Sequence, residues 1–212
     1  VLILAYACNI IAINFLQGIL VYYFKYVYLA ESRTTAAMVI LLVITMFFIP
    51  VSVPVSKRIG KKLTYQIGLA ALAATCMILF FAGHILGMNF FIAMMGLAGV
   101  GLGLTYVAPW AMVPDAIEWD VVNTGSRKEG SYYGMWTFLS KCGQAISIGA
   151  SGLILGLSGY AAETTLGPKA IFAIRLILGP VPAAVFIGAI LILSAYPITE
   201  KIYNEMMKKR SS

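Results

Sequence analysis

The chain contains 212 residues, of which 61% are hydrophobic and only 11% are charged, and its mean hydropathy is +0.91. About a quarter of the residues of an ordinary soluble domain are charged, so this composition excludes a soluble globular fold and indicates a membrane protein. The net charge of +7 does not indicate a nucleic-acid partner, because the basic residues lie in short segments between apolar runs. Three cysteines and one histidine, without metal-ligand spacing, predict neither a metal site nor a cofactor.

Six apolar segments are each long enough to cross the roughly 30 Å hydrocarbon core of a bilayer as a helix. The helices are expected at residues 2–23, 35–53, 63–83, 88–113, 131–157 and 170–196, followed by a basic tail at 197–212. The predicted fold is therefore all-α, a single six-helix transmembrane domain. We expect the second helix to end near Pro50 and Pro54 and the fourth to stop at Pro114, because proline lacks the backbone donor.

The chain begins at Val1, inside an apolar run, with no basic segment or cleavage site before it. This start is not typical of a signal peptide. Either a leader has been removed or the chain is a piece of a longer protein.

Basic residues are distributed unequally between alternate loops. Only Lys25, Arg33 and Lys169 fall on one side. The other side carries Lys57, Arg58, Lys61, Lys62, Arg127, Lys128, Lys201, Lys208, Lys209 and Arg210. Cytoplasmic loops are the ones that carry an excess of lysine and arginine, so this second side is predicted to be cytoplasmic. Both termini then lie in the cytoplasm, which agrees with an even number of spans.

Glycines are concentrated in the fourth and fifth predicted helices. The fourth contains Gly96, Gly99, Gly101 and Gly103, and the fifth contains Gly143, Gly149, Gly152 and Gly156. Small residues let helix backbones approach closely in lipid, so we interpret these glycines as packing positions.

Lys141 lies about ten residues into the fifth predicted helix, hence about 15 Å deep and near the bilayer midplane. A lysine there costs about 2.5–3.5 kcal/mol on insertion scales, so it needs a polar partner or a water-filled cavity. Thr137 and Gln144 share its helix face at i−4 and i+3. Extension of the side chain to an interface, or a structural pairing with another helix, is the alternative, but the depth of Lys141 favours a functional role.

A second polar set lies on the first predicted helix. Tyr6, Asn9, Asn14 and Gln17 fall within one arc of roughly 140° at about 100° per residue. Such side chains either line an aqueous path or form hydrogen bonds with neighbouring helices. Amides and tyrosines also supply the neutral donors, acceptors and aromatic faces that bind sugars.

Charged residues follow the fourth predicted helix. Asp115 and Glu118 are three residues apart, and Arg127 comes shortly after them. The three residues are candidates for a cytoplasmic charge network that forms in one conformation and breaks in another. A solvated loop is the alternative, and for the remaining charged residues of this stretch it is the better interpretation.

Three segments resemble one family when they are taken in this order: PDAIEW at 114–119, TGSRKEG at 124–130 and FLSKCGQA at 138–145. They are similar to the glycoside–pentoside–hexuronide:cation symporters, sugar transporters of the melibiose-permease type within the major facilitator superfamily. The resemblance covers the whole chain as the second half of a twelve-helix protein. It implies that Lys141 lies by the sugar and cation sites and that Thr137 faces the sugar.

The resemblance also assigns the remaining candidates. Tyr106 stands where melibiose permease has a tryptophan near the sugar, and Asp115, Glu118 and Arg127 match a cytoplasmic charged network. Val121 departs from the family where an acid is common. The cation-coordinating carboxylates of the family lie on helices of the first half, which are absent from this sequence.

These observations together predict the C-terminal half of a secondary transporter that moves a sugar, glycoside or sugar acid with Na⁺ or H⁺. The expected partners are the lipid bilayer, here that of the bacterial inner membrane, an N-terminal six-helix half and a small sugar-like substrate. The predicted substrate-binding residues are Lys141, Thr137, Tyr106, Gln144, Asn14 and Gln17. The alternative is a self-contained six-helix channel or a homodimeric half-size transporter. An enzyme is disfavoured because the sequence buries no catalytic carboxylate, histidine pair or nucleophile.

Overall fold

The computed structural model describes residues 1–159 and 166–198, and every regular element within these ranges is helical. The elements are α1 (Leu2–Tyr26), the 3₁₀ turn η1 (Glu31–Arg33), α2 (Thr34–Ile59), α3 (Lys61–Ile78), the π-helical turn η2 (Leu79–Gly83), α4 (His84–Thr124), α5 (Glu129–Leu157), α6 (Pro168–Leu178) and α7 (Pro180–Ser194). Most of the predicted basic tail, residues 199–212, lies outside the described residues.

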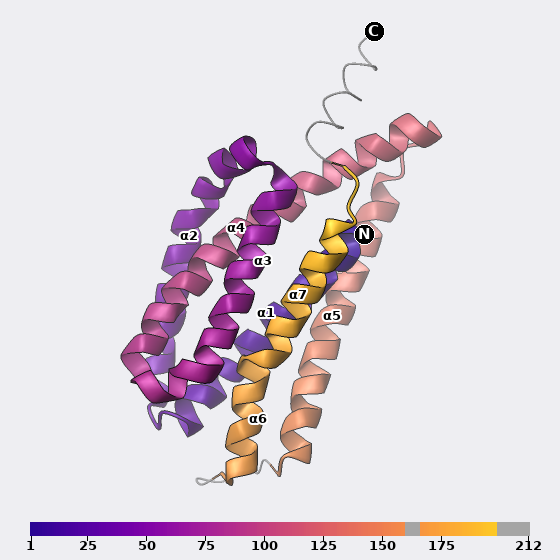
Figure 1. Ribbon diagram of the computed structural model, residues 1–212. Coiled ribbons are helices and arrows are strands. Elements are labelled where there is room, and N and C mark those ends of the chain that lie inside the picture. Colours follow the sequence, from indigo (N-terminus) through magenta and orange to yellow (C-terminus); the bar gives the residue numbers. More distant parts are fainter. Residues whose placement is uncertain (160–165, 199–212) are drawn as a thin grey trace.

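Five helical stretches in the described part of the chain are long and apolar enough to cross a membrane. One of them, Lys61–Thr124, has 64 residues and reverses direction at Gly87, where φ is 80° and ψ is −179°. α3 and α4 consequently run side by side in opposite directions (Figure 1), so this stretch crosses twice. The described residues make six crossings, as the sequence predicts, so the chain is a multi-pass membrane protein.

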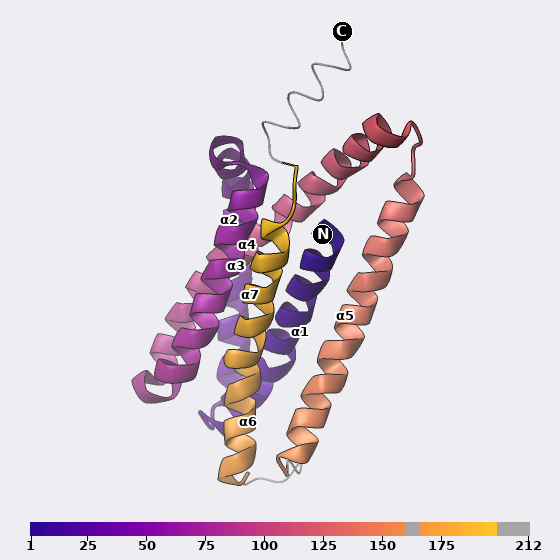
Figure 2. The ribbon, with the colours of Figure 1, turned by 45° about the vertical axis from the view of Figure 1, so that its right-hand side comes forward.

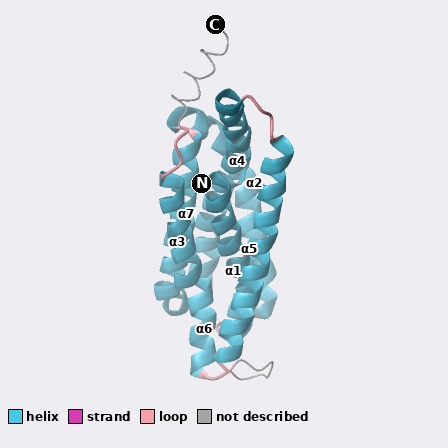
Figure 3. Ribbon diagram, turned by 90° about the vertical axis from the view of Figure 1, so that its right-hand side faces the viewer, coloured by secondary structure: helices cyan, strands magenta, loops and turns pink. Residues whose placement is uncertain are grey.

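The helices form two sides of a bundle. α2, α3 and α4 pack together on one side, and α1, α5, α6 and α7 pack together on the other, with α3 and α7 in contact between the two sides (Figures 1 and 3). α2 exposes Val39, Leu42, Val43, Met46 and Phe47, a patch that only lipid or another protein segment can cover. The bundle therefore presents large apolar side chains outward as well as burying them between helices, as a protein in lipid requires.

Basic residues gather at one end of the bundle, which we call the basic end. It contains Lys57 and Arg58 at the end of α2, Lys61 at the start of α3, and Arg127 and Lys128 between α4 and α5. The start of α1 and the end of α7 lie at the same end (Figure 1). There α4 extends beyond the start of α1 and joins α5 through a short connection (Figure 2).

The glycines of α4 allow two close helix contacts. A Cβ added to Gly103 would lie 2.6 Å from the Cβ of Phe48 on α2. On the α3 side, a Cβ added to Gly101 would lie 3.0 Å from the carbonyl oxygen of Gly68. Only glycine fits at these approaches, and in lipid such close packing is a principal source of helix association.

Two predicted helix ends are wrong. α2 continues through Pro50 and Pro54 to Ile59, and α4 continues through Pro114 to Thr124. Proline is tolerated inside membrane helices because a break there would leave more backbone groups without hydrogen-bond partners than the proline itself removes. The signal that ends α4 is Gly125, which has the left-handed φ of 69° that is typical of a residue after a helix.

The last crossing is kinked, as its prolines permit. α6 and α7 are separated by Gly179, whose φ and ψ are −107° and −93°. A Cβ at this glycine would lie 2.5 Å from the Cβ of Phe80. At the kink the last crossing therefore packs closely against η2, the turn that follows α3.

Candidate functional site

Lys141 lies near the middle of α5, twelve residues after Glu129, which corresponds to about 18 Å along the helix axis. Its ammonium Nζ lies 3.4 Å from Oε1 of Gln144. Thr137 and Lys141 are exposed, and Gln144 is half-buried. These three predicted site residues therefore lie on one face of α5 that the described helices leave open.

No carboxylate within the described residues contacts Lys141. Four of the acids described are paired elsewhere by ion pairs at the basic end, and the fifth, Glu31, lies in the η1 turn. An ammonium with a single neutral partner retains unused donors, so the α5 face can bind an anion or a set of hydroxyl groups. The described residues contain no group of three acids, cysteines or histidines arranged to hold a metal ion.

Three aromatic rings join α1, α4 and α5. Tyr6 stacks on Trp136 with 3.8 Å between ring centroids and an interplanar angle of 20°. Trp110 lies 5.3 Å from Trp136 and 6.5 Å from Tyr6. We call these three residues the aromatic trio. Tyr106, a predicted site residue, is 62% exposed and precedes Trp110 by one helical turn, on the same face of α4.

The predicted polar residues of α1 do not join the α5 face by any direct hydrogen bond that the structure shows. Asn14 donates from Nδ2 to the carbonyl oxygen of Ile10, 2.8 Å away on its own helix. Gln17 is exposed and lines a cavity of about 320 Å³ between α1, α2, α3 and α4. Aliphatic residues such as Leu41, Leu72 and Leu102 form most of its wall, so this cavity differs in character from the Lys141 face.

Asn9 points into the bundle. It is 2% exposed and lies beside the hydroxyl of Tyr65, a fully buried residue of α3. Buried amides of this kind hold neighbouring helices together. Of the four polar residues predicted on this arc, Asn9 therefore belongs to the helix contact and not to the open face.

At the basic end, a short ion pair joins α3 and α4. Lys61 Nζ lies 2.6 Å from Oδ2 of Asp115, and the two side chains are 29% and 14% exposed. Burial raises the pKa of the neighbouring Tyr196 hydroxyl, and the negative charge of Asp115 raises it further. The partner of Asp115 is thus Lys61, whose place in the sequence indicated only topology.

The other two residues of the predicted charge network do contact each other. Arg127 Nη2 lies 3.4 Å from Oε1 of Glu118, and its Nε lies 3.1 Å from Oε1 of Glu129. The structure therefore places Asp115 in one pair and Glu118 with Arg127 in a separate group, both at the end of α4.

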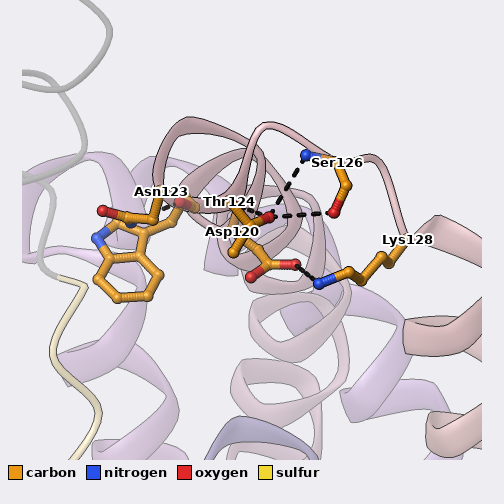
Figure 4. A network of polar contacts seen from close by, with 6 residues as sticks. Asp120, Asn123, Thr124, Ser126 and Lys128 are labelled. Carbon is orange, nitrogen blue, oxygen red and sulfur yellow. Dashed lines mark hydrogen bonds and ion pairs between the residues drawn. The ribbon is translucent and has the colours of Figure 1, made fainter.

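The other charged residues of this stretch, for which a solvated loop was predicted, also form contacts. Figure 4 shows Lys128 reaching Asp120, with 3.8 Å between the nitrogen and the oxygen. In the same view the hydroxyl groups of Thr124 and Ser126 are 3.3 Å apart. These contacts hold the α4–α5 connection against the last turn of α4.

A second set of contacts at the basic end, between α3 and the end of α7, was not predicted from the sequence. Lys62 Nζ donates to the carbonyl oxygens of Ser194 and Tyr196, at 2.7 and 2.8 Å, and Gln66 Nε2 donates to the Ser194 hydroxyl at 3.0 Å. These donors satisfy carbonyls that a helix end leaves free. The only sequence signal was the basic turn before α3, which indicated topology but not a partner.

Residues 1–200 match the family described as "MFS/sugar transport protein". The chain belongs to this family. The MFS chain is 38% identical over 151 residues, 71% of its length, to the "Glucuronide carrier protein homolog" of Escherichia coli (strain K12), of which the match covers 33%. It is 29% identical over 214 residues, 99% of its length, to the "Putative 2,3-dihydroxypropane-1-sulfonate exporter" of the same strain, covering 45% of that relative.

A vertebrate relative matches as well. The "Sodium-dependent lysophosphatidylcholine symporter 1-A" of Danio rerio is 24% identical over 203 residues, which are 94% of this MFS chain and 38% of the relative. The chain therefore spans less than half the length of these curated relatives. They are named as a carrier, an exporter and a symporter, and the MFS chain belongs with such transporters and not with enzymes.

Proposed function

We propose that this MFS chain is the C-terminal six-helix half of a secondary transporter that moves a sugar, glycoside or sugar acid together with Na⁺ or H⁺. Two observations support the assignment to a half. The chain makes six crossings, and its matches cover less than half of each relative described above. In transporters of this architecture two halves related by an axis along the membrane normal hold the substrate between them.

The proposed orientation places the basic end, and with it both ends of the chain, in the cytoplasm. The described loops carry most of their lysines and arginines at that end, and such an excess is typical of the cytoplasmic side. The membrane proposed is the bacterial inner membrane, because the relatives with the highest identity described above belong to Escherichia coli.

The observation that carries the proposed function is Lys141. Its ammonium lies midway along a membrane helix with one neutral partner, on an open face shared with Thr137 and Gln144. A charge in that position is unfavourable by a few kcal/mol unless something compensates it. A substrate carboxylate, or a carboxylate of the other half, would supply the compensation.

The names of two relatives favour an anionic substrate. A glucuronide and 2,3-dihydroxypropane-1-sulfonate, which appear in those names, both combine hydroxyl groups with one negative charge. Lys141 would bind the charge, and Thr137 and Gln144 would bind hydroxyl groups. Tyr106 would add an aromatic face to this wall, whereas Asn14 and Gln17 would have to contact the substrate from α1, away from the Lys141 face. We therefore favour a sugar acid within the proposed substrate class.

The coupling cation is proposed to bind mainly to the other half. Sodium needs several oxygen ligands, and the described acids of this chain lie at the basic end and in the η1 turn. The ion pair of Asp115 and the group formed by Glu118 and Arg127 are proposed to stabilise one of the two alternating conformations.

The test uses the full-length transporter in proteoliposomes. We expect Lys141→Met to reduce D-glucuronate uptake driven by a sodium or proton gradient at least about tenfold, while the amount of folded protein remains normal, because the change removes the cost of burying a charge. Lys141→Arg should restore little of the uptake, since the planar guanidinium group of arginine does not replace the compact ammonium group of lysine. Lys169→Met, a matched change at the exposed start of α6, should have no effect. Normal binding and uptake by the Met variant would contradict the proposed function of Lys141.

A further inference from the structure

A cluster around one arginine lies at the end of the bundle opposite the basic end. Arg175 of α6 donates from Nη2 to the carbonyl oxygen of Phe80, 3.1 Å away in η2, and to Nδ1 of His84 at 3.0 Å. The central carbon of its guanidinium group also lies 5.4 Å from the centre of the Phe80 ring. We call Arg175, His84 and Phe80 the Arg175 cluster. These contacts join α6 to the turn between α3 and α4.

The Arg175 cluster lies at the boundary of the membrane. α3 has 18 residues and η2 has five, and such a stretch covers about 35 Å, slightly more than the roughly 30 Å hydrocarbon core. His84 follows directly, and the chain reverses direction three residues later at Gly87. α6 extends beyond this turn (Figures 1 and 2). Arg175 therefore reaches the level of the turn from inside its helix.

No carboxylate of the described residues neutralises Arg175. The four ion pairs in that part of the chain lie at the basic end. An arginine always donates, so Nδ1 of His84 is an acceptor and its ring is neutral. The hydrogen bonds of Arg175 use only Nη2, and its buried Nε has no partner among the described residues. The guanidinium therefore keeps its charge, and both N–H groups of Nη1, for an anion.

The surroundings of the Arg175 cluster indicate which anion can reach it. Four large apolar side chains nearby are each more than half exposed: Phe81, Ile85, Leu86 and Phe172. The rings of Phe81 and Phe172 both contact Phe80. A face as apolar as this is suited to contact with lipid, and at the membrane boundary the anionic group of a lipid is its phosphate. Extension of the arginine into water does not describe this side chain, which is half-buried and bonded to η2.

We propose that the Arg175 cluster binds the phosphate of an anionic phospholipid, whose acyl chains lie along the four exposed apolar side chains. Arginine matches the oxygen geometry of a phosphate and forms strong charge-assisted hydrogen bonds with it. Nε2–H of His84 donates to a second phosphate oxygen, because Nδ1 of the same ring accepts from Arg175. The lipid supplies the negative charge that the described residues lack there. This inference depends on the membrane location of the chain and not on the substrate that it transports.

The experiment measures lipid contact locally by photo-crosslinking of the full-length transporter in phosphatidylcholine liposomes. The probes are trace amounts of phosphatidylglycerol or phosphatidylcholine, each with the same diazirine-bearing acyl chain, and peptide mass spectrometry measures labelling of residues 79–87 and 168–178. The variant is Arg175→Gln, which removes the charge but keeps a donor for the Phe80 carbonyl. Arg33→Gln is the matched control, because Arg33 is an exposed arginine in η1 at the same end of the bundle. Thermal unfolding of each variant verifies its folding.

In the unchanged protein we expect phosphatidylglycerol to label these peptides about fivefold more than phosphatidylcholine does, the preference that one basic residue near the membrane surface provides. Arg175→Gln should abolish the preference without reducing labelling by phosphatidylcholine, and Arg33→Gln should retain it. Equal labelling by the two lipids in the unchanged protein, or an unaltered preference in the Gln variant, would overturn the lipid site. Absence of labelling by either probe would show that protein covers this face, and would also overturn it. Loss of the preference in excess inorganic phosphate would assign the cluster to a soluble anion instead.

Discussion

The contact between Gly103 of α4 and Phe48 of α2 provides a direct test of how this bundle is held together. In Gly103→Ala the new methyl carbon would lie 2.6 Å from the Phe48 Cβ and 3.1 Å from the Thr45 carbonyl oxygen. Carbon atoms in contact are normally about 3.5–4.0 Å apart, so α2 and α4 would have to separate by roughly 1 Å. Overpacking of this kind costs about 1–3 kcal/mol, which changes the ratio of folded to unfolded protein roughly 5- to 150-fold.

The assay is thermal unfolding of the full-length transporter in detergent, with Gly188→Ala as the matched control. Gly188 lies inside α7, and an added Cβ there has no atom within 4 Å. Alanine is favoured over glycine in a helix by about 0.8–1.0 kcal/mol, so the control should be neutral or slightly more stable. Gly103→Ala should unfold at a lower temperature. If the two variants have the same stability, or if their order is reversed, the glycine contact does not determine the packing of α2 against α4.

Three further predictions concern the basic end and the isolated chain. Asp115→Asn should destabilise the full-length protein by about 1–3 kcal/mol in thermal unfolding, because it leaves the Lys61 cation with a weakened partner. Asp120→Asn is the control, and it should cost less than about 1 kcal/mol because the ion pair of Asp120 is longer and more exposed. Equal losses of stability in the two variants would contradict this prediction. In intact cells, Ser32→Cys should react with a membrane-impermeant thiol reagent above the background of the parent protein, and Ser126→Cys should not; the opposite pattern would invert the proposed topology. Residues 1–212 alone in liposomes should show no gradient-driven D-glucuronate uptake, because the described residues provide no acid near Lys141. Uptake that matches that of the full-length protein would contradict the division of the site between two halves.

The membrane environment, the number of crossings and the face of α5 that carries Lys141 all follow from the amino-acid sequence. Length and apolarity decide whether a segment spans a bilayer, and they do not depend on neighbouring helices. Helical periodicity alone places Thr137, Lys141 and Gln144 on one face, and the structure has them there. The order of the charged segments was also sufficient to reveal the family.

The sequence did not determine where the helices end. Pro50, Pro54 and Pro114 each indicated an end, but α2 and α4 continue through them. Within the bilayer, lipid offers no water to a broken backbone, so a helix that meets a proline there tends to continue. The reversal between α3 and α4 depends on the positive φ of Gly87, one glycine among many. Helix propensity describes only the local free-energy cost of a proline or glycine in a helix. Whether the helix continues through that residue depends on the bilayer and on the neighbouring helices.

Tertiary structure alone decided which residues meet. Glycines were read as packing positions in both α4 and α5, but Gly103 touches α2, whereas an added Cβ at Gly152 or Gly156 meets nothing among the described residues. Lys61 binds Asp115, 54 residues away. These contacts depend on the rotation and separation of whole helices, which result from the summed packing of many small side chains and not from any local pattern.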